Sequence, residues 1–277
     1  MKEKINQEIK IKIYRDFNSH LEVIWKKMWA KNDLYIFQNF DWLKSWYDTV
    51  GRYSLKVIPI IVHVKIFERD VAIFPFGLRE TYGSKVLEFL GGGQVDYNTP
   101  IIDLTLGEED LFERVWELVN QKLPKHDIQN FVRMVKPKDN KKIDFTKYLS
   151  LKTHEISSAA SLSDTWETFK LRLPKKFSKD NARMNRRLSE LGELKFEVIT
   201  DKININQKLD IMFAQKQRRY KETKARDILA DQNVKNFYKT IIKRSHIFDG
   251  IHFSLLSLDQ KILATHFGAH SNGRFYY

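Results

Sequence analysis

Eight basic side chains lie between residues 170 and 187, where the only acidic residue is Asp180. They are Lys170, Arg172, Lys175, Lys176, Lys179, Arg183, Arg186 and Arg187. Spacings of three and four residues would place four of these along one side of a helix: Lys179, Arg183, Arg186 and Arg187. Because guanidinium groups bind phosphates bidentately, the run predicts a binding surface for an anionic acceptor such as a nucleotide sugar. A solvated helix face in a lysine-rich chain is the alternative interpretation.

One histidine near the end of the chain, His266, has neighbours that leave room for a ligand. In an extended strand, Ala264, His266 and Gly268 share one face. A neutral imidazole can take a proton from an amine near neutral pH, so His266 is the candidate catalytic base. A buried, hydrogen-bonded structural histidine is the alternative. The spacing of His, Asp and Glu does not resemble a metal site, so we expect no metal.

Three consecutive glycines, Gly91 to Gly93, precede Asp96 and Tyr97. A phosphate loop needs its glycines to run directly into a helix. Here about fourteen residues separate Gly93 from a helix predicted at Glu108, so we expect the glycines to permit a close approach of the backbone instead. Asp96 and Tyr97 are candidate substrate-binding residues in a cleft between two halves; a turn aspartate and a packed tyrosine are the alternative.

An alternating pattern of helices and strands would position these residues. Apolar periodicity and capping residues predict the order β-α-α-β-β-β-α-β in the first half. The predicted strands are 11–14, 55–67, 71–78, 85–90 and 128–135. The predicted helices are 18–30, a helix opened by Asn39, and 108–123. Segment 136–142, KPKDNKK, contains no apolar residue except proline and is the predicted linker. We therefore divide the chain into residues 1–142 and 143–277.

The same order begins again in the second half, which predicts a duplication. We expect strands over 154–157, 194–199, 251–258 and 262–270. We also expect a helix from Ser163 with Trp166 facing inward and a basic helix over 176–191 capped by Gly192. Two further helices, over 207–221 and 234–246, are inserted before the last two strands. Residues 274–277 begin a further strand. The second copy lacks its last helix and strand, so we expect a truncated C-terminus.

Composition narrows the function classes. The net charge is +13, and residues 151–277 contribute most of it, with 24 basic and 14 acidic side chains. The lack of cysteine excludes thiol catalysis and disulfide frameworks. We find no secretory signal and no apolar run of membrane-spanning length, so we expect a cytoplasmic protein. Hydrolase and Walker motifs do not occur.

Several short motifs resemble the GNAT-fold acetyltransferase family associated with cellulose and exopolysaccharide synthesis (CelD-like), which is related to the Fem-type aminoacyltransferases. The resemblance extends from about residue 10 to the last residue. Its motifs are FDWLKSW at 40–46, AIFPF at 72–76, FLGGGQVDYNTP at 89–100, the basic helix through LGEL at 191–194, Gln217-Arg218 and ILATHFG at 262–268.

This resemblance implies a tandem GNAT-like α/β fold with a non-catalytic first half and an incomplete second copy. It also implies transfer of an acyl group from acetyl-CoA or another acyl-CoA to an amine, without a covalent enzyme intermediate. In such folds two parallel strands splay apart, and one of them binds the pantetheine arm. Strand 262–270 would be that strand here, with four coenzyme-binding residues: Ala264, Thr265, Phe267 and Gly268.

We therefore expect acyl-CoA-dependent N-acylation of an amino group on a cell-surface polysaccharide precursor. Two alternatives stay open. One is a Fem-type transferase that uses aminoacyl-tRNA and a peptidoglycan precursor, with the basic helix as the docking surface for the tRNA. The other is a binding module without enzymatic activity. Signatures of RRM, KH or helix-turn-helix modules do not occur, so we expect no other nucleic-acid partner.

Overall fold

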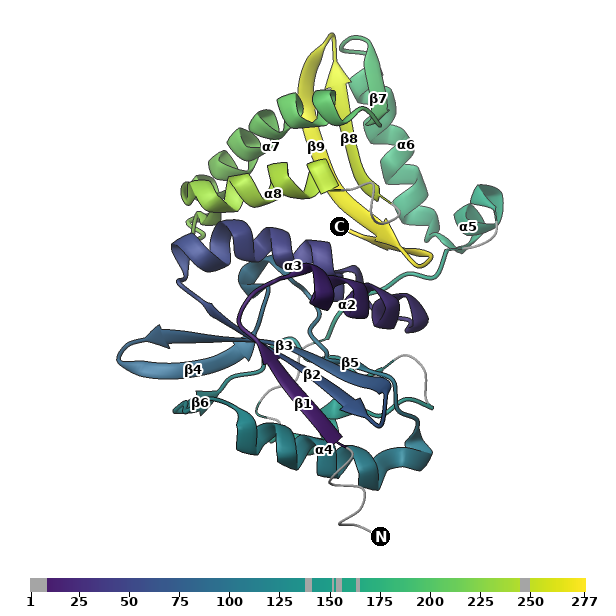
Figure 1. Cartoon of the computed structure of the whole chain (residues 1–277). Helices are drawn as coiled ribbons and strands as arrows, with labels where there is room; N and C mark the ends of the chain where they lie inside the picture. Colours follow the sequence, from purple (N-terminus) through teal and green to yellow (C-terminus); the bar gives the residue numbers. More distant parts are fainter. Residues whose placement is uncertain (1–8, 138–140, 151, 153–155, 163–164, 245–249) are drawn as a thin grey trace.

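A computed structural model describes residues 9–137, 141–150, 152, 156–162, 165–244 and 250–277. It contains two β-sheets, and each sheet packs one face against helices that meet near the centre of the molecule (Figure 1). The central core contains residues from both sheets and from four helices, including Trp25, Trp46, Phe213, Phe237 and Phe253. The two halves of the chain therefore share one core.

The first sheet follows the predicted order. Its strands are β1 (Ile9–Tyr14), β2 (Ile58–Ile66), β3 (Arg69–Thr81), β4 (Ser84–Phe89), β5 (Ile101–Ile102) and β6 (Ile128–Gln129). Strands β1 to β4 are antiparallel neighbours, β6 lies parallel to β4, and β5 pairs with β3. The helical segments are α2 (Ser19–Lys31), η1 (Ile36–Gln38), α3 (Phe40–Trp46), the π-helical η2 (Tyr47–Ser54), η3 (Gly92–Gln94), η4 (Leu106–Glu108), α4 (Glu109–Lys122) and η5 (Phe145–Tyr148).

Two asparagines fix where the first helices begin, as predicted. The Asn18 side chain accepts a hydrogen bond from the Leu21 amide, and the Asn39 side chain accepts from the Asp41 amide. The predicted strand 128–135 is largely wrong, because only its first two residues pair with β4. Beyond them the chain pairs with Asn98, whose amide donates to the Arg133 carbonyl at 2.7 Å.

The second sheet contains β7 (Leu194–Ile199), β8 (Gly250–Leu258), β9 (Lys261–Ser271) and β10 (Arg274–Tyr276) in sequential antiparallel order. Its helical segments are α5 (Trp166–Arg172), α6 (Lys175–Ser189), α7 (Lys202–Thr223), η6 (Ile228–Ala230) and α8 (Gln232–Arg244). Asp259 and Gln260 both have positive φ and form the tight turn between β8 and β9. Helices α7 and α8 lie along one side of these strands (Figure 1).

The two sheets repeat one order of elements, but in a different register from the one predicted. The order β7-α7-α8-β8-β9-β10 corresponds to β1-α2-α3-β2-β3-β4. Helices α7 and α8 are therefore counterparts of α2 and α3 and are not insertions. Of the strand predicted at 154–157, residues 154 and 155 lie outside the described residues, and Ile156 and Ser157 are not in a strand.

Two further predictions need correction. Residues 163 and 164 of the predicted helix from Ser163 lie outside the described residues, and Trp166 is exposed instead of facing inward. Helix α6 ends at Glu190 in right-handed conformation, without a left-handed glycine cap. Gly192 is required for another reason: a Cβ there would collide with the Asp259 carboxylate, which accepts a hydrogen bond from the Glu193 amide at 2.8 Å.

Residues 138–140 of the predicted linker lie outside the described residues. Its end is held against the first half. The Lys142 ammonium lies 3.3 Å from the Asp103 carboxylate, and Lys142 forms a backbone bridge with Thr105. The boundary between residues 142 and 143 stays a proposal.

Candidate functional site

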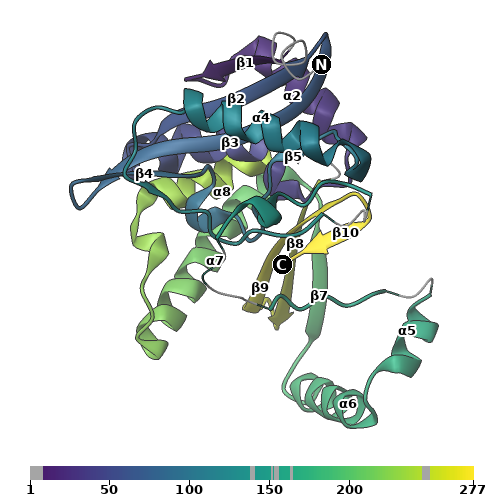
Figure 2. The same cartoon turned by 90° about the horizontal axis from the view of Figure 1, so that it is seen from below.

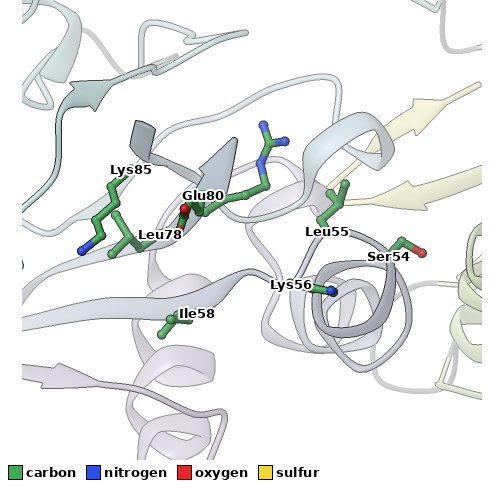
Figure 3. Close-up of a pocket in the computed structure, with 8 residues that line it drawn as sticks. Ser54, Leu55, Lys56, Ile58, Leu78, Glu80 and Lys85 are labelled. Atoms are coloured by element: carbon green, nitrogen blue, oxygen red, sulfur yellow. The ribbon is translucent and has the colours of Figure 1, made fainter. Parts of the chain in front are cut away.

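A surface hollow with a volume of about 480 Å³ lies in the first half (Figure 3). It is lined by Ser54, Leu55, Lys56, Ile58, Leu78, Arg79, Glu80 and Lys85. The Arg79 guanidinium is paired with the Glu88 carboxylate through two contacts of 2.9 and 3.1 Å. None of the predicted site residues lines this hollow, and its arginine is already neutralised.

A smaller hollow of about 150 Å³ lies between the two halves, and we call it the inter-half pocket. The first half contributes Phe37, Trp42, Gly93, Gln94 and Asp96, and the second half contributes Phe237, Tyr238, Phe267, Gly268, Ala269, Tyr276 and Tyr277. Most of the wall is aromatic, and Asp96 supplies a carboxylate. Pockets with apolar walls and a few polar groups are typical ligand sites.

Contacts across the two halves hold the walls in place. The Trp42 indole donates a hydrogen bond to the Gln94 carbonyl at 3.0 Å, and its ring packs edge-on against Phe237, 5.4 Å away. The Phe37 ring packs in the same way against Tyr276, with centroids 5.4 Å apart. Arg274 of the second half is also paired with Asp33 of the first half. The pocket is therefore built from side chains that both halves immobilise.

The triple glycine packs beside this pocket, which confirms its structural interpretation. Gly91 and Gly92 have φ of +117° and +52°, a region that favours glycine. A Cβ on Gly92 would lie 3.1 Å from the Trp46 ring, and one on Gly91 would collide with Val95. These two glycines allow the loop to lie close to α3, while Gly93 lines the pocket.

Tyr238 is a pocket residue that the sequence analysis did not identify. Its ring packs edge-on against Phe267 at 5.2 Å. Burial, with smaller contributions from Tyr220 and Asp96, raises the pKa of Tyr238 to about 12. The hydroxyl is therefore protonated at neutral pH and can donate a hydrogen bond into the pocket.

Strand β9 has an edge that ends at the pocket. Strand β10 pairs with β9 only over Ala269–Ser271, and within the described ranges no strand pairs with residues 261–268 on the edge opposite β8. The side chains of Thr265 and Phe267 face the helices, since the Thr265 hydroxyl donates to the Gln215 side-chain oxygen at 2.8 Å. The predicted parallel neighbour of this strand is not found, because β8 and β10 are both antiparallel to it.

His266 lies beside the pocket, on the face of β9 opposite Phe267. Its ring stacks on Phe275 at 5.7 Å, and the rings of His252 and Tyr277 lie 5.4 and 6.1 Å away. Burial lowers the pKa of His266, with smaller contributions from His252 and Lys216. The imidazole is therefore neutral at neutral pH, next to a wall residue of the pocket, Tyr277.

Asp96 and Tyr97 have different surroundings. Asp96 lines the pocket, as predicted for a cleft residue. The Tyr97 ring instead packs against Tyr35 at 4.6 Å, and its carbonyl accepts a hydrogen bond from the Gln38 side chain at 2.6 Å. The packing of Tyr97 agrees with the alternative interpretation of that residue.

The four basic residues predicted to bind an anionic acceptor, Lys179, Arg183, Arg186 and Arg187, all lie on α6. Figure 2 shows α6 extended away from β9. The Arg183 guanidinium is paired with Asp180 at 3.1 Å, and that of Arg186 lies 3.6 Å from the Glu190 carboxylate on the same helix turn. None of these four basic side chains lines the inter-half pocket beside Asp96.

Within the described ranges, no group of three or more His, Asp or Glu side chains is placed to hold a metal ion. None of the helices in that part of the chain combines the length and the apolar character that a bilayer crossing requires.

Residues 175–277 match the family model of an acetyltransferase (GNAT) domain. Comparison with curated proteins gave no match. The matched segment includes α6 and the whole β7-α7-α8-β8-β9-β10 unit, and thus the β9 edge and the second-half wall of the pocket. The mixed α/β architecture is consistent with a GNAT-like fold, and the match supports acyl transfer as the general activity.

Proposed function

We propose that this chain is an acyl-CoA-dependent N-acyltransferase whose acceptor is an amino group, carried by a precursor of a cell-surface polysaccharide. The observation that carries the proposal is the position of the inter-half pocket. It lies where the unpaired edge of β9, within the segment that matches a GNAT domain, meets the Asp96 carboxylate of the first half.

The residues present fit an acyl-CoA. Backbone groups of residues 261–268 lack a strand partner on one edge within the described chain, so the amides of a pantetheine arm can pair there. Ala264, Thr265, Phe267 and Gly268 are the proposed contacts. The inter-half pocket has a volume of about 150 Å³. That space suits an acyl group and an amine, and the nucleotide would stay outside. The coenzyme supplies the activated acyl thioester.

Three side chains divide the proposed proton chemistry. The Asp96 carboxylate attracts an acceptor in its ammonium form, and the nitrogen must release one proton to water before it has the lone pair that attacks the thioester. The neutral His266 imidazole accepts the amine proton as the new N–C bond forms, and the Tyr238 hydroxyl donates its proton to the sulfur as the C–S bond breaks. Because the chain has no cysteine, we propose direct transfer to the acceptor.

The aromatic walls support a sugar as the acceptor. Phe37, Trp42 and Tyr276 give the pocket an apolar lining beside the Asp96 carboxylate. An amino sugar has an apolar ring face to stack on these walls and an amine to approach Asp96. Together with the resemblance to enzymes of polysaccharide synthesis, this chemistry favours an amino sugar over an aliphatic polyamine.

Release of coenzyme A is the direct test of the proposed function. A thiol-reactive chromophore would report only the product, because the protein has no thiol of its own. We expect release from acetyl-CoA to require an amino sugar and to stop when the matched N-acetylated sugar replaces it. Calorimetric binding of acetyl-CoA without acceptor-dependent release would instead support a binding module.

Salt dependence distinguishes acyl-CoA from aminoacyl-tRNA as the donor. A tRNA contacting about six phosphates should lose roughly 10³-fold in affinity between 50 and 200 mM salt. A coenzyme held mainly by backbone pairing should respond weakly. Steeply salt-dependent tRNA binding, together with no acetyl-CoA binding, would favour the aminoacyl-transfer alternative.

A further inference from the structure

Residues 166–191 form a projecting segment that we call the basic arm. It contains α5 and α6, which extend from the rest of the molecule (Figure 2). Neither helix buries a side chain within the described residues. The arm carries eight Lys or Arg residues and three acidic residues, Glu167, Asp180 and Glu190. A helix pair that contributes nothing to the core and carries this charge needs another explanation.

Apolar side chains form a stripe along α6 and its C-terminal end, and most of this stripe is exposed to solvent. Phe177, Met184, Leu188 and Leu191 are separated by seven, four and three residues, which places them within about 60° of one another around the helix axis. Phe177, Met184 and Leu191 are 56%, 58% and 71% exposed. Short uncharged side chains border the stripe on one side, and the basic residues follow on the other.

Helix α5 adds two large apolar side chains to the same arm. Trp166 is 60% exposed and Leu171 is 87% exposed. The Lys170 ammonium lies 5.7 Å from the centre of the Trp166 ring. A tryptophan beside lysines is typical of segments that lie at the boundary between water and lipid, where the ring meets the acyl chains and the cations meet the headgroups.

We propose that the basic arm docks on the surface of an anionic lipid bilayer, with the apolar stripe in the interface and the cations on the headgroups. Charge complementarity selects anionic lipid, since each Lys or Arg near such a surface adds to the attraction. The exposed leucines and Met184 favour lipid over RNA, because RNA bases stack on aromatic side chains and not on aliphatic ones. The inference is independent of acyl transfer.

Flotation with vesicles tests the docking. We expect the full chain to float with phosphatidylcholine vesicles that contain 30% phosphatidylglycerol and not with pure phosphatidylcholine. The double substitution Arg186→Gln/Arg187→Gln should lower the partition coefficient about 30-fold. The melting temperature should stay unchanged, because α6 buries no side chain.

The matched control is Arg218→Gln/Arg219→Gln on α7. It removes the same net charge from adjacent arginines of equal exposure, since the side chains of Arg186 and Arg218 are 73% and 72% exposed. Each of these two arginines also lies near a glutamate four residues ahead, at 3.6 and 3.7 Å. The control should float like the original chain. An equal loss in both variants would overturn the proposal in favour of nonspecific attraction by net charge.

A second variant tests the apolar stripe. Phe177→Ser/Met184→Ser/Leu191→Ser should lower vesicle binding roughly 10-fold or more, because the buried apolar area is lost while the charge is kept. Poly(U) RNA is the competing probe. The proposal is wrong if the chain does not float with anionic vesicles, if it binds poly(U) but not vesicles, or if the triple serine variant floats unchanged.

Discussion

The two sheets have the same strand order, and they differ in what covers their outer faces. In the first sheet, Phe74 and Phe76 pack beneath α4, whose Phe112 and Trp116 close a second core. In the second sheet, Phe196, Val198 and Phe275 face outward and are 65%, 50% and 44% exposed. Within the described residues, the second sheet therefore has helices on one face only.

Their histidines also differ in burial. In the first sheet, His63 is 4% exposed and its ring is bonded to the Asp70 carboxylate at 2.9 Å. In the second sheet, His252 and His266 lie half-buried on the outer face, near the unpaired edge of β9. The comparison suggests that the first sheet acts as a scaffold, whereas the second keeps backbone and side-chain groups accessible to ligands.

Phe112→Ala should have the largest effect. The side chain is fully buried between α4 and the first sheet, so its removal should lower the free energy of unfolding by about 3–5 kcal/mol. Urea denaturation measures the loss.

The matched change on the second sheet is Phe196→Ala. Because this ring is exposed, the loss should stay within about 0.5 kcal/mol. Similar losses for the two variants would show that the outer face of the second sheet is also covered in solution, and the comparison would fail.

His266→Ala should lower turnover about 10²-fold if the imidazole accepts the amine proton. The pKa of His266 is lowered, so the rate of the unchanged enzyme should rise with pH through a midpoint below the ordinary value of 6.5. That acid limb should disappear in the variant.

His252→Ala is the control, because this histidine lies on the same face, 5.4 Å from His266. It should keep turnover and the acid limb. If His266→Ala lowered only the melting temperature, the imidazole would be structural.

A smaller effect concerns pH and stability. Burial lowers the pKa of His63. The Asp70 carboxylate raises this pKa, whereas Lys65 and His20 lower it further. The Tyr14 ring lies 6.4 Å from the His63 ring. The unfolded chain therefore binds a proton at His63 near pH 6.5, whereas the folded chain binds it only at a lower pH. Stability contributed by His63 is complete above that pH and is lost as the pH falls toward the lowered pKa.

The slope from this one proton cannot exceed about 1.4 kcal/mol per pH unit. His63→Gln should flatten the dependence of stability between pH 5 and pH 7, as measured by urea denaturation at each pH. An unchanged slope in this variant would assign the pH dependence to other groups.

Local signals predicted most of the fold. Asn18 and Asn39 mark the starts of helices because capping depends on adjacent residues alone. The register of the repeat was not predicted, because it depends on contacts between residues that are distant in sequence. Spacing on α6 predicts an amphipathic helix, but spacing does not reveal whether its apolar stripe meets a core, and here it meets none among the described residues.

The candidate site was predicted in part. Asp96, Phe267 and Gly268 do meet in one pocket, since a loop aspartate and a strand with small residues are recognisable locally. Tyr238 was missed because its surroundings come from Asp96 and Phe267, which are distant in sequence. The basic residues of α6 were misplaced because charge pattern does not determine where a helix points.

Hydrogen exchange with and without acetyl-CoA tests most directly whether the second sheet holds the coenzyme. Bound pantetheine should slow exchange in peptides that cover residues 261–277, where the β9 edge meets the pocket. Peptides that cover residues 84–89, strand β4 of the first half and the counterpart of β10, should exchange at the same rate, because none of these residues lines the pocket. Slower exchange confined to residues 84–89 would contradict the account.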